Sequence, residues 1–289
     1  MDGVQRYRGI DRQYTVTRLQ PFTDYVFQLE ACTGVGCTTG KPQIITSAEI
    51  FPEGQGVPTF AFSNDTVVVI AWNPPAVPNG IIVRYEVLRQ ENALSARKRR
   101  AVSVSGVIVV YATNDTNKTD FRYVDIGLKP YTRYEYKILA INSAGNGESD
   151  WTAVETKQSS PVGVAPPSVN QVDYKTLLLT WTKPAQPNGI ISFYFLKRNG
   201  SIMHQGKELN FTDFDREPFT VYSYTVVACT GGGCTESAPG YGRTAESAPE
   251  QIAPPVMTVL SAIAIRADWV KPVKPNGKLC FVSLCISCV

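Results

Sequence analysis

Four of the seven cysteines fall into two matched pairs, and these are the residues with the clearest chemistry. Cys32 and Cys37 form one pair and Cys229 and Cys234 the other, each separated by four residues that include two or three glycines. On neighbouring strands of a tight hairpin, such cysteines face each other within reach of a disulfide. Two free buried thiols or a metal pair are alternatives, although metal sites favour a two-residue spacing and four ligands. We predict two disulfides, each worth only about 2 kcal/mol because its loop is short.

Five Asn-x-Ser/Thr sequons point to the same compartment as the paired cysteines. They begin at Asn64, Asn114, Asn117, Asn199 and Asn210. Each sequon alone is a weak signal, but glycosylation and disulfides both belong to the secretory pathway. We therefore expect an extracellular or cell-surface setting.

The sequence offers no set of residues for catalysis. His204 is the only histidine, so a histidine-based triad, a multi-histidine metal site or a histidine relay lacks a partner. We expect His204 on an exposed strand edge or turn. The acidic residues show no recurring pair for general acid–base work, and residues 231–233, a run of three glycines, lie between cysteines instead of before a helix. We predict that the chain is not an enzyme and binds no cofactor and no metal.

A basic run is the strongest charged feature of the sequence. It consists of Arg97, Lys98, Arg99 and Arg100. A processing protease could cut such a run on an exposed loop, or the run could bind acidic glycans. A solvated loop is the simpler interpretation and the one we favour.

The overall composition agrees with an extracellular binding module. A net charge of +3 is too small to indicate nucleic-acid binding, and no run approaches the ~18 apolar residues that span a bilayer. The first residues carry charges where a signal peptide needs an apolar core. A chain of 289 residues has room for two or three domains of about 100 residues each.

The cysteine hairpins lie inside a longer segment that occurs three times. Residues 218–234 read PFTVYSYTVVACTGGGC, residues 21–37 read PFTDYVFQLEACTGVGC, and residues 130–146 read PYTRYEYKILAINSAGN. Every second residue after the tyrosine is apolar, which is the period of a half-buried strand entered through a proline-fixed corner. The corner tyrosines, Tyr25, Tyr134 and Tyr222, can return their hydroxyls to nearby backbone.

A second marker shows the same spacing. Trp72, Trp181 and Trp269 each precede a Pro-Asn-Gly sequence by six residues. The offsets between successive members of this set of three tryptophans are 109 and 88 residues, and the corner tyrosines give the same two values. Two independent markers with equal offsets indicate an internal repeat.

This combination of tryptophan, Pro-Asn-Gly and Leu-x-Pro-x-Thr-x-Tyr resembles the fibronectin type III repeat along nearly the whole chain. The resemblance implies an all-β fold of tandem antiparallel sandwiches of seven strands each. Such arrays also occur in intracellular muscle proteins, which the sequons and cysteine pairs disfavour. The Ala-Cys-Thr-Gly-x-Gly-Cys stretch further resembles repeats of a large cell-surface protein of basement membranes, hair-cell stereocilia links and the photoreceptor periciliary region. That resemblance implies a role in hearing and vision.

The repeat markers predict four domains. Residues 49–157 and 158–247 each hold a complete set, residues 1–48 hold only the later strands, and residues 248–289 hold the opening strands with a divergent tail. The first complete repeat carries 21 extra residues between tryptophan and corner tyrosine, which we expect to form an extended loop or an added hairpin. Cys280, Cys285 and Cys288, in the tail, have no equivalent elsewhere, and we expect no fixed partners for them.

We expect a non-catalytic spacer and adhesion segment of an extracellular protein, with other extracellular proteins as partners. The two partial domains could also pair between chains, because each would expose an apolar face and unpaired strand edges. Ectodomains of phosphatase- or kinase-type signalling receptors use the same repeats and form the alternative. An accessory domain of a secreted carbohydrase is a further one.

Overall fold

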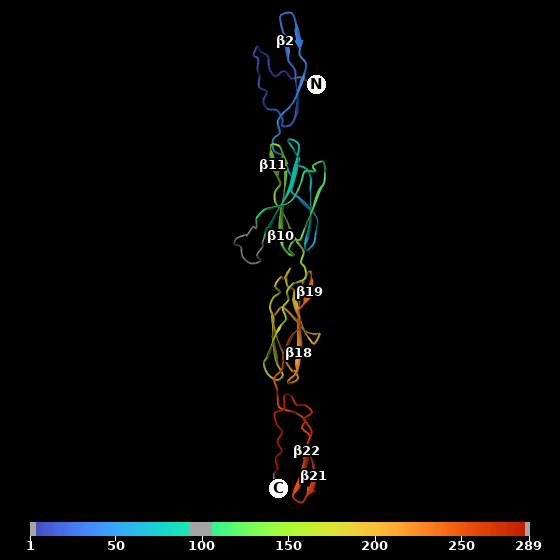
Figure 1. Ribbon diagram of the computed structural model, residues 1–289. Coiled ribbons are helices and arrows are strands. Elements are labelled where there is room, and N and C mark those ends of the chain that lie inside the picture. The colour runs from blue at the N-terminus through green and yellow to red at the C-terminus, as the bar shows by residue number, and fades with distance from the viewer. Residues whose placement is uncertain (1–3, 93–105, 287–289) are drawn as a thin grey trace. The chain divides into compact units, whose positions relative to one another are not determined.

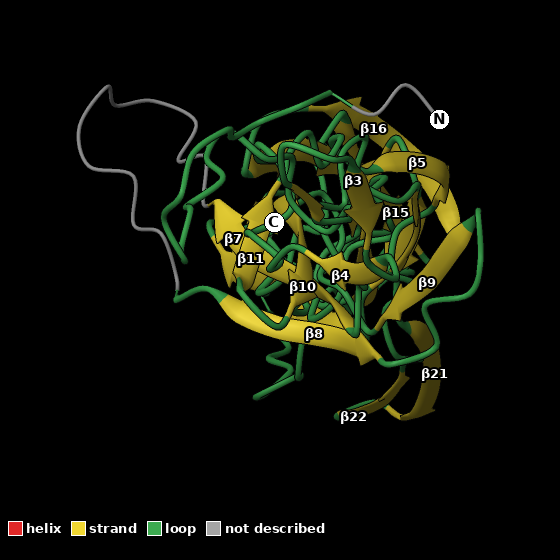
Figure 2. Ribbon diagram, turned by 90° about the horizontal axis from the view of Figure 1, so that it is seen from above, coloured by secondary structure: helices red, strands yellow, loops and turns green. Residues whose placement is uncertain are grey.

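The structure is a computed structural model that describes residues 4–92 and 106–286. It divides into two compact units, Met1–Lys157 and Gln158–Val289. All regular elements in the described residues are strands (Figures 1 and 2). Each unit holds one two-layered sandwich and one smaller region of short hairpins, so the predicted all-β class is confirmed.

The sandwich of the first unit consists of two antiparallel sheets. One sheet has the order β5 (Thr59–Ser63), β6 (Val67–Trp72), β9 (Phe121–Ile126). The other has the order β11 (Gly145–Glu148), β10 (Arg133–Asn142), β7 (Arg84–Asn92), β8 (Ile108–Thr113), with β12 (Thr152–Glu155) also paired to β10. Seen end-on, β7 lies on the opposite side from β5 and β9 (Figure 2).

The sandwich of the second unit repeats this arrangement. One sheet has the order β13 (Ser168–Gln171), β14 (Leu177–Thr180), β17 (Asn210–Asp213). The other has the order β16 (Ser201–Gly206), β15 (Phe193–Arg198), β18 (Val221–Thr230), β19 (Gly233–Glu236), with β20 (Gly240–Arg243) also paired to β18.

The period-two patterns place the core of each sandwich as predicted. Val68, Ile70 and Trp72 alternate into the interior of the first, and Leu177, Leu179 and Trp181 into that of the second. The corner strands contribute the facing residues on alternate positions, because successive side chains of a strand point to opposite faces. In the first sandwich these are Tyr134, Tyr136, Ile138 and Ala140, and in the second Tyr222, Tyr224, Val226 and Ala228.

A buried serine interrupts the last strand of each sandwich, so that this strand is numbered as two. Ser149 lies between β11 and β12, and its hydroxyl accepts a hydrogen bond from the backbone N–H of Ile138 at 3.0 Å. Ser237 does the same to Val226 at 3.0 Å between β19 and β20. The serine hydroxyl takes the place of one backbone acceptor of the sheet, so the two parts form a single strand with an interruption.

The extra length of the first sandwich lies on either side of a strand that both sandwiches share. β8 pairs with β7 in the same way as β16 pairs with β15. It is therefore a strand that both sandwiches share, and not part of the added hairpin that was one of the two structures expected for the extra residues. In the second sandwich only Asn199 and Gly200 separate the paired residues Arg198 and Ser201. In the first, residues 90–107 separate the paired Arg89 and Ile108.

The two remaining regions are built from short hairpins. Near the N-terminus β1 (Asp24–Phe27) pairs with β4 (Gln43–Thr46), and β2 (Glu30–Cys32) with β3 (Cys37–Thr39). Near the C-terminus β21 (Val256–Ser261) pairs with β22 (Ala264–Asp268). Their apolar side chains stay exposed, as the 84% exposure of Leu29 and the 97% exposure of Ile263 show.

Candidate functional site

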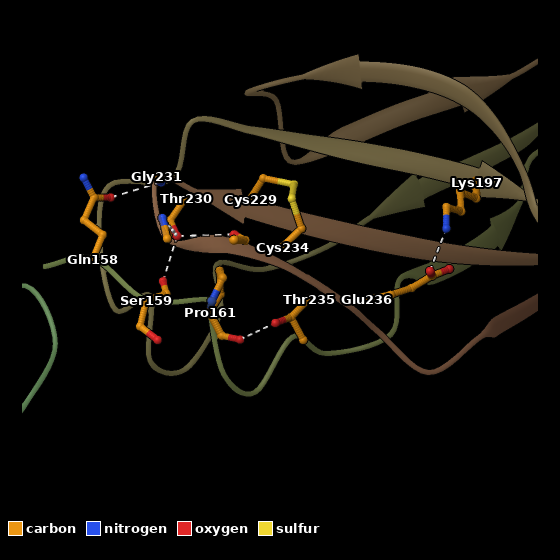
Figure 3. Close-up of a disulfide and its surroundings, with 12 residues drawn as sticks. Gln158, Ser159, Pro161, Lys197, Cys229, Thr230, Gly231, Cys234, Thr235 and Glu236 are labelled. Carbon is orange, nitrogen blue, oxygen red and sulfur yellow. Dashed lines mark hydrogen bonds and ion pairs between the residues drawn. A yellow bond between two sulfur atoms is a disulfide. The ribbon is translucent and has the colours of Figure 1, made fainter. Parts of the chain in front are cut away.

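The cysteine hairpin of the second sandwich lies at the end where the chain enters the domain (Figure 3). Cys229 and Cys234 are register partners at the end of the β18–β19 ladder, and their Sγ atoms are joined at 2.07 Å. Gly233 has a φ of +140°, a conformation that favours glycine. The bridge therefore closes a four-residue turn whose backbone groups face the incoming chain.

Three hydrogen bonds attach this hairpin to the peptide that leads into the domain. The Thr230 hydroxyl donates to the carbonyl of Ser159 at 2.7 Å, and the Thr235 hydroxyl donates to the carbonyl of Pro161 at 2.6 Å (Figure 3). The backbone N–H of Gly231 donates to the Gln158 side-chain oxygen at 3.3 Å. The hairpin thus holds a peptide segment of its own chain.

The hairpin near the N-terminus has the same pairing without this environment. Cys32 and Cys37 are register partners with Sγ atoms joined at 2.13 Å. The Glu30 carboxylate and both sulfurs lie within 4.8 Å of one another. A metal pair here would need both thiols free, and four ligands are usual for a structural zinc site.

The first sandwich has Ile141 and Asn146 at the cysteine positions. Its incoming peptide is held through a carboxylate of the peptide itself, that of Glu49. Glu49 accepts hydrogen bonds from the Ser143 hydroxyl, from the Ser143 backbone N–H at 3.1 Å and from the Ile81 N–H at 2.8 Å. The Ser143 hydroxyl, followed by the Ile81 N–H, lowers the pKa of Glu49 because both bonds favour the ionised form.

Each sandwich buries a carboxylate network that the sequence analysis missed. Asp213 accepts two bonds from Arg198 at 2.9 Å, one from the Tyr224 hydroxyl at 2.7 Å, and lies 3.3 Å from Arg216. Burial, followed by the bond to Asp213, raises the pKa of Tyr224. The network links both sheets, because Asp213 lies on β17 and Tyr224 on β18.

The first sandwich repeats the network with one arginine fewer. Asp125 accepts a bond from Arg89 at 2.7 Å and one from the Tyr136 hydroxyl at 2.8 Å. Burial, followed by the Asp125 charge, raises the pKa of Tyr136. Asp125 and Asp213 are 88 residues apart, like the corner tyrosines, so the repeat offsets could have identified them from the sequence.

The predicted tyrosine corners are confirmed in all three copies. Each corner hydroxyl accepts a hydrogen bond from a backbone N–H five residues upstream. The pairs are Tyr25 with Gln20 at 2.7 Å, Tyr134 with Lys129 at 2.9 Å and Tyr222 with Glu217 at 2.9 Å.

The sequon asparagines occupy different environments. Asn114, Asn117 and Asn210 are exposed. The Asn64 side-chain oxygen is half-buried and accepts bonds from the N–H groups of Thr66 at 2.9 Å and Val67 at 2.6 Å. Asn199 is exposed, and its side-chain oxygen accepts a bond from the Ser223 N–H at 3.1 Å.

His204 lies on an edge strand as expected, but it is not exposed. It belongs to β16, and its half-buried ring lies 4.8 Å from that of Phe211. Its Nε2 is 3.5 Å from Glu208 Oε2. Cys280 and Cys285 are exposed free thiols. Cys288 and the basic run Arg97, Lys98, Arg99 and Arg100 lie outside the described residues.

The comparisons with known proteins agree with this architecture. The family model of the fibronectin type III domain matches residues 57–156, which contain the strands of the first sandwich. The second sandwich has the same strand order and a buried network around the equivalent aspartate. The chain is therefore an all-β protein of tandem fibronectin type III repeats.

Over nearly its whole length, the chain is similar to usherin. It is 39% identical to usherin from Rattus norvegicus over 96% of the chain and 6% of that protein. It is also 39% identical to usherin from Homo sapiens, over 96% of the chain and 5% of that protein. The phosphatidylinositol phosphatase PTPRQ of Rattus norvegicus is 29% identical over 91% of the chain and 11% of its own length. The chain thus spans about one-twentieth of the usherins that it resembles.

The residues that the structure describes contain no helix long and apolar enough to cross a membrane.

Proposed function

We propose that the chain is a non-catalytic extracellular segment of a large usherin-like protein, where it serves as a spacer and adhesion surface. The observation that carries the proposal is that similarity to usherin runs through 96% of the chain, across both sandwiches and both flanking regions. The whole chain is therefore one stretch of a repeat array. A usherin-like protein of this kind would act in the extracellular links of stereocilia, in the photoreceptor periciliary region and in basement membranes.

The domain division is part of this proposal. We place complete fibronectin type III repeats at residues 49–157 and 158–247, and partial repeats at residues 1–48 and 248–289. The equal offsets of the tryptophan, the corner tyrosine and the buried aspartate support these boundaries. Extracellular proteins are the partners that such a segment would contact.

Expression of the chain in the secretory pathway tests whether the protein is extracellular. The chain, carrying an added secretion signal, is expressed in animal cells and mapped by non-reducing peptide analysis and N-glycanase treatment. We expect links within the pairs Cys32–Cys37 and Cys229–Cys234, and glycans at exposed Asn114, Asn117 or Asn210, each lost in its Asn→Gln variant. Secreted protein with both hairpins fully alkylated and no glycan would contradict the extracellular assignment.

We also propose that the flanking regions of the isolated 289-residue chain pair between two copies. Residues 1–48 supply later strands and residues 248–289 supply opening strands, and the described parts of both expose apolar side chains. Head-to-tail pairing would bury these faces, and such heterologous contacts form open chains unless they close. In light scattering we expect the full chain to self-associate and a shorter chain of residues 57–247 to stay monomeric. A full chain that remains monomeric at tens of micromolar would contradict the pairing.

The receptor alternative rests on the similarity to PTPRQ, a phosphatidylinositol phosphatase. The chain carries no part that we assign to catalysis, so a receptor role would depend on other domains. The sequence of the complete transcript distinguishes the two, because a downstream membrane span followed by a phosphatase or kinase domain would favour the receptor.

A further inference from the structure

The peptide that leads into each repeat makes the same contacts three times. Residues 49–53, 158–162 and 246–250 run beside the Pro-Asn-Gly turn of the repeat that follows them. The first contact is a backbone bond to the carbonyl of the turn asparagine. It joins Ile50 to Asn79 at 3.3 Å, Ser159 to Asn188 at 2.9 Å and Ser247 to Asn276 at 2.9 Å.

The turn asparagine also binds the peptide through its side chain. Its amide nitrogen donates to the carbonyl of Phe51 at 3.1 Å, of Ser160 at 3.0 Å and of Ala248 at 2.9 Å in the three copies. All three asparagines have positive φ values, between 50° and 53°. Asparagine tolerates this left-handed conformation better than most residues, so one residue type supplies both the turn and the contact.

A third contact comes from the first residue of the peptide. The side-chain oxygens of Glu49, Gln158 and Glu246 accept hydrogen bonds from backbone N–H groups just beyond the turn. The donors are Ile81 at 2.8 Å, Ile190 at 2.9 Å and Lys278 at 3.2 Å. An isolated bridge closes each peptide four residues later, as between Val162 and Gln186.

The residue before each of these peptides is already bonded to the preceding repeat. The Lys157 N–H donates to the carbonyl of Asn64 at 2.9 Å, and its own carbonyl accepts a bond from Tyr131 at 3.1 Å. Ala48 accepts a bond from Phe22 at 3.1 Å, and Ala245 donates to Asp173 at 3.1 Å. Contacts therefore pass from the preceding to the following repeat at 48/49 and 157/158, which match the proposed domain bounds, and at 245/246, two residues before the proposed bound at 247/248.

We propose that the end of each repeat is a docking site for its own incoming peptide, formed by the turn asparagine and by the residue at position 49, 158 or 246. In the second repeat the cysteine hairpin completes the site. Given the spacer function proposed above, the site confines bending between repeats to one residue boundary. Residues 158–162 are then a bound segment of the second repeat instead of a free linker.

The glycines of the hairpin support this assignment. A Cβ on Gly232 would lie 2.3 Å from the Gln158 carbonyl oxygen and 2.5 Å from the Ser159 Cα, a backbone clash. A Cβ on Gly231 would meet only the Gln158 side chain, at 3.3 Å. Gly232 thus lies where any side chain would collide with the docked backbone.

Hydrogen exchange of the full chain tests the site, with Gly232→Ala as the main variant and Gly34→Ala, the same change in the hairpin near the N-terminus, as its control. Gly232→Ala should raise exchange in peptides covering residues 158–162 about five- to tenfold, because the docked backbone must move. Gly34→Ala should leave these rates within about twofold, since a Cβ on Gly34 meets nothing within 4 Å. Gln158→Ala should act like Gly232→Ala, and Gln171→Ala, on an exposed strand residue of the same repeat, should not.

Exchange in β14 and β18 separates loss of docking from loss of fold, because both strands should keep their protection in every variant. Unchanged exchange at residues 158–162 in both Gly232→Ala and Gln158→Ala would overturn the docking site. That result would leave the secretion and glycan-mapping outcomes untouched, so failure of this inference is distinguishable from failure of the proposed function. A full chain whose residues 158–162 already exchange at the free-peptide rate would overturn it as well.

Discussion

The two sandwiches hold their incoming peptides at the same place with different chemistry. The first uses the carboxylate of Glu49 together with Ser143, and residues Ile141 and Asn146 face each other at the base of its hairpin. The second uses the neutral amide of Gln158 together with Gly231, above the Cys229–Cys234 bridge. The contact is retained while its charge and its covalent support change, so neither the carboxylate nor the bridge is needed to form it.

The buried networks differ in a similar way. Within the described residues, Asp125 of the first sandwich pairs with one arginine, whereas Asp213 of the second has two, Arg198 and Arg216. Arg216 stands where the first repeat has Leu128, so this departure from the repeat pattern has a structural reason. We therefore expect the second sandwich to depend more on its carboxylate.

Removing the carboxylate charge should produce the largest effect and should separate the two sandwiches. Asp213→Asn leaves two arginines without their counter-charge, and we expect a loss of about 2–4 kcal/mol in the stability of the second sandwich. Asp125→Asn should cost the first sandwich less, because it leaves only Arg89 uncompensated. Hydrogen exchange of the β18 and β10 amides measures each sandwich in the full chain.

A matched control for the charge is Asp215→Asn. Asp215 is exposed and has a φ of 59°, which asparagine adopts readily, so this change should leave the stability within about 0.5 kcal/mol. Equal losses for Asp125→Asn and Asp213→Asn would contradict the importance of the second arginine.

Exchanging the hairpin chemistry should give the next largest effect. Cys229→Ser with Cys234→Ser should lower the local stability of the β18–β19 hairpin by about 2 kcal/mol, because the closed loop is short. The reciprocal double change, Ile141→Cys with Asn146→Cys, should form a bridge, since these residues are register partners. Peptide mapping detects the new bridge, and hydrogen exchange measures the local stability of each hairpin. Free thiols at both new positions would show that the hairpins are not equivalent.

The strands could be predicted from the sequence because their information is local. The alternation of Val68, Ile70 and Trp72 fixes which face is buried, and the proline-led corner fixes where the tyrosine strand begins. The docking contacts could not be predicted in this way, because Glu49 reaches Ser143 across 94 positions of the chain. A glutamate in an interdomain segment gives no sign of its partner until the fold brings the two together.

The buried carboxylate lies between these two cases, because aligning the repeats of the sequence gives partial evidence for its contact. At the offset of 109 residues, Val16 corresponds to Asp125 and Phe27 corresponds to Tyr136. The copy without the aspartate thus also lacks the tyrosine hydroxyl that would bind it. This paired difference indicates a contact, but it becomes convincing only once the structure joins Tyr136 to Asp125.

Removing that hydroxyl should have a smaller effect than removing the charge. Tyr136→Phe deletes one hydrogen bond to Asp125, while Arg89 still compensates the carboxylate, so we expect a loss of about 1 kcal/mol. In a double-mutant cycle with Asp125→Ala the two losses should not add, because both changes remove the same contact. Strict additivity, measured by exchange of the β10 amides, would mean that the hydroxyl acts independently of Asp125.

The smallest effect should be a pH dependence that only one of the two docking sites shows. The pKa of Glu49 is lowered from its ordinary value of 4.5, so its contribution is fully present at neutral pH and is lost as the pH falls through the lowered value. Gln158 does not titrate. Below about pH 4.5 the amides of Ile81 and Ser143 should therefore lose protection relative to those of Ile190 and Gly231, by no more than about threefold for a half-buried group near solvent.

The variant Glu49→Gln makes the first site resemble the second, and it should abolish this difference while docking is retained at neutral pH. The reverse change, Gln158→Glu, should transfer the pH dependence to Ile190 and Gly231. Because intrinsic exchange also varies with pH, each rate is compared with that of the same amide in the Gln-containing protein. A pH dependence that persists at Ile81 in Glu49→Gln would place its origin outside the docking site, and the two sites would then differ in more than the charge of one side chain.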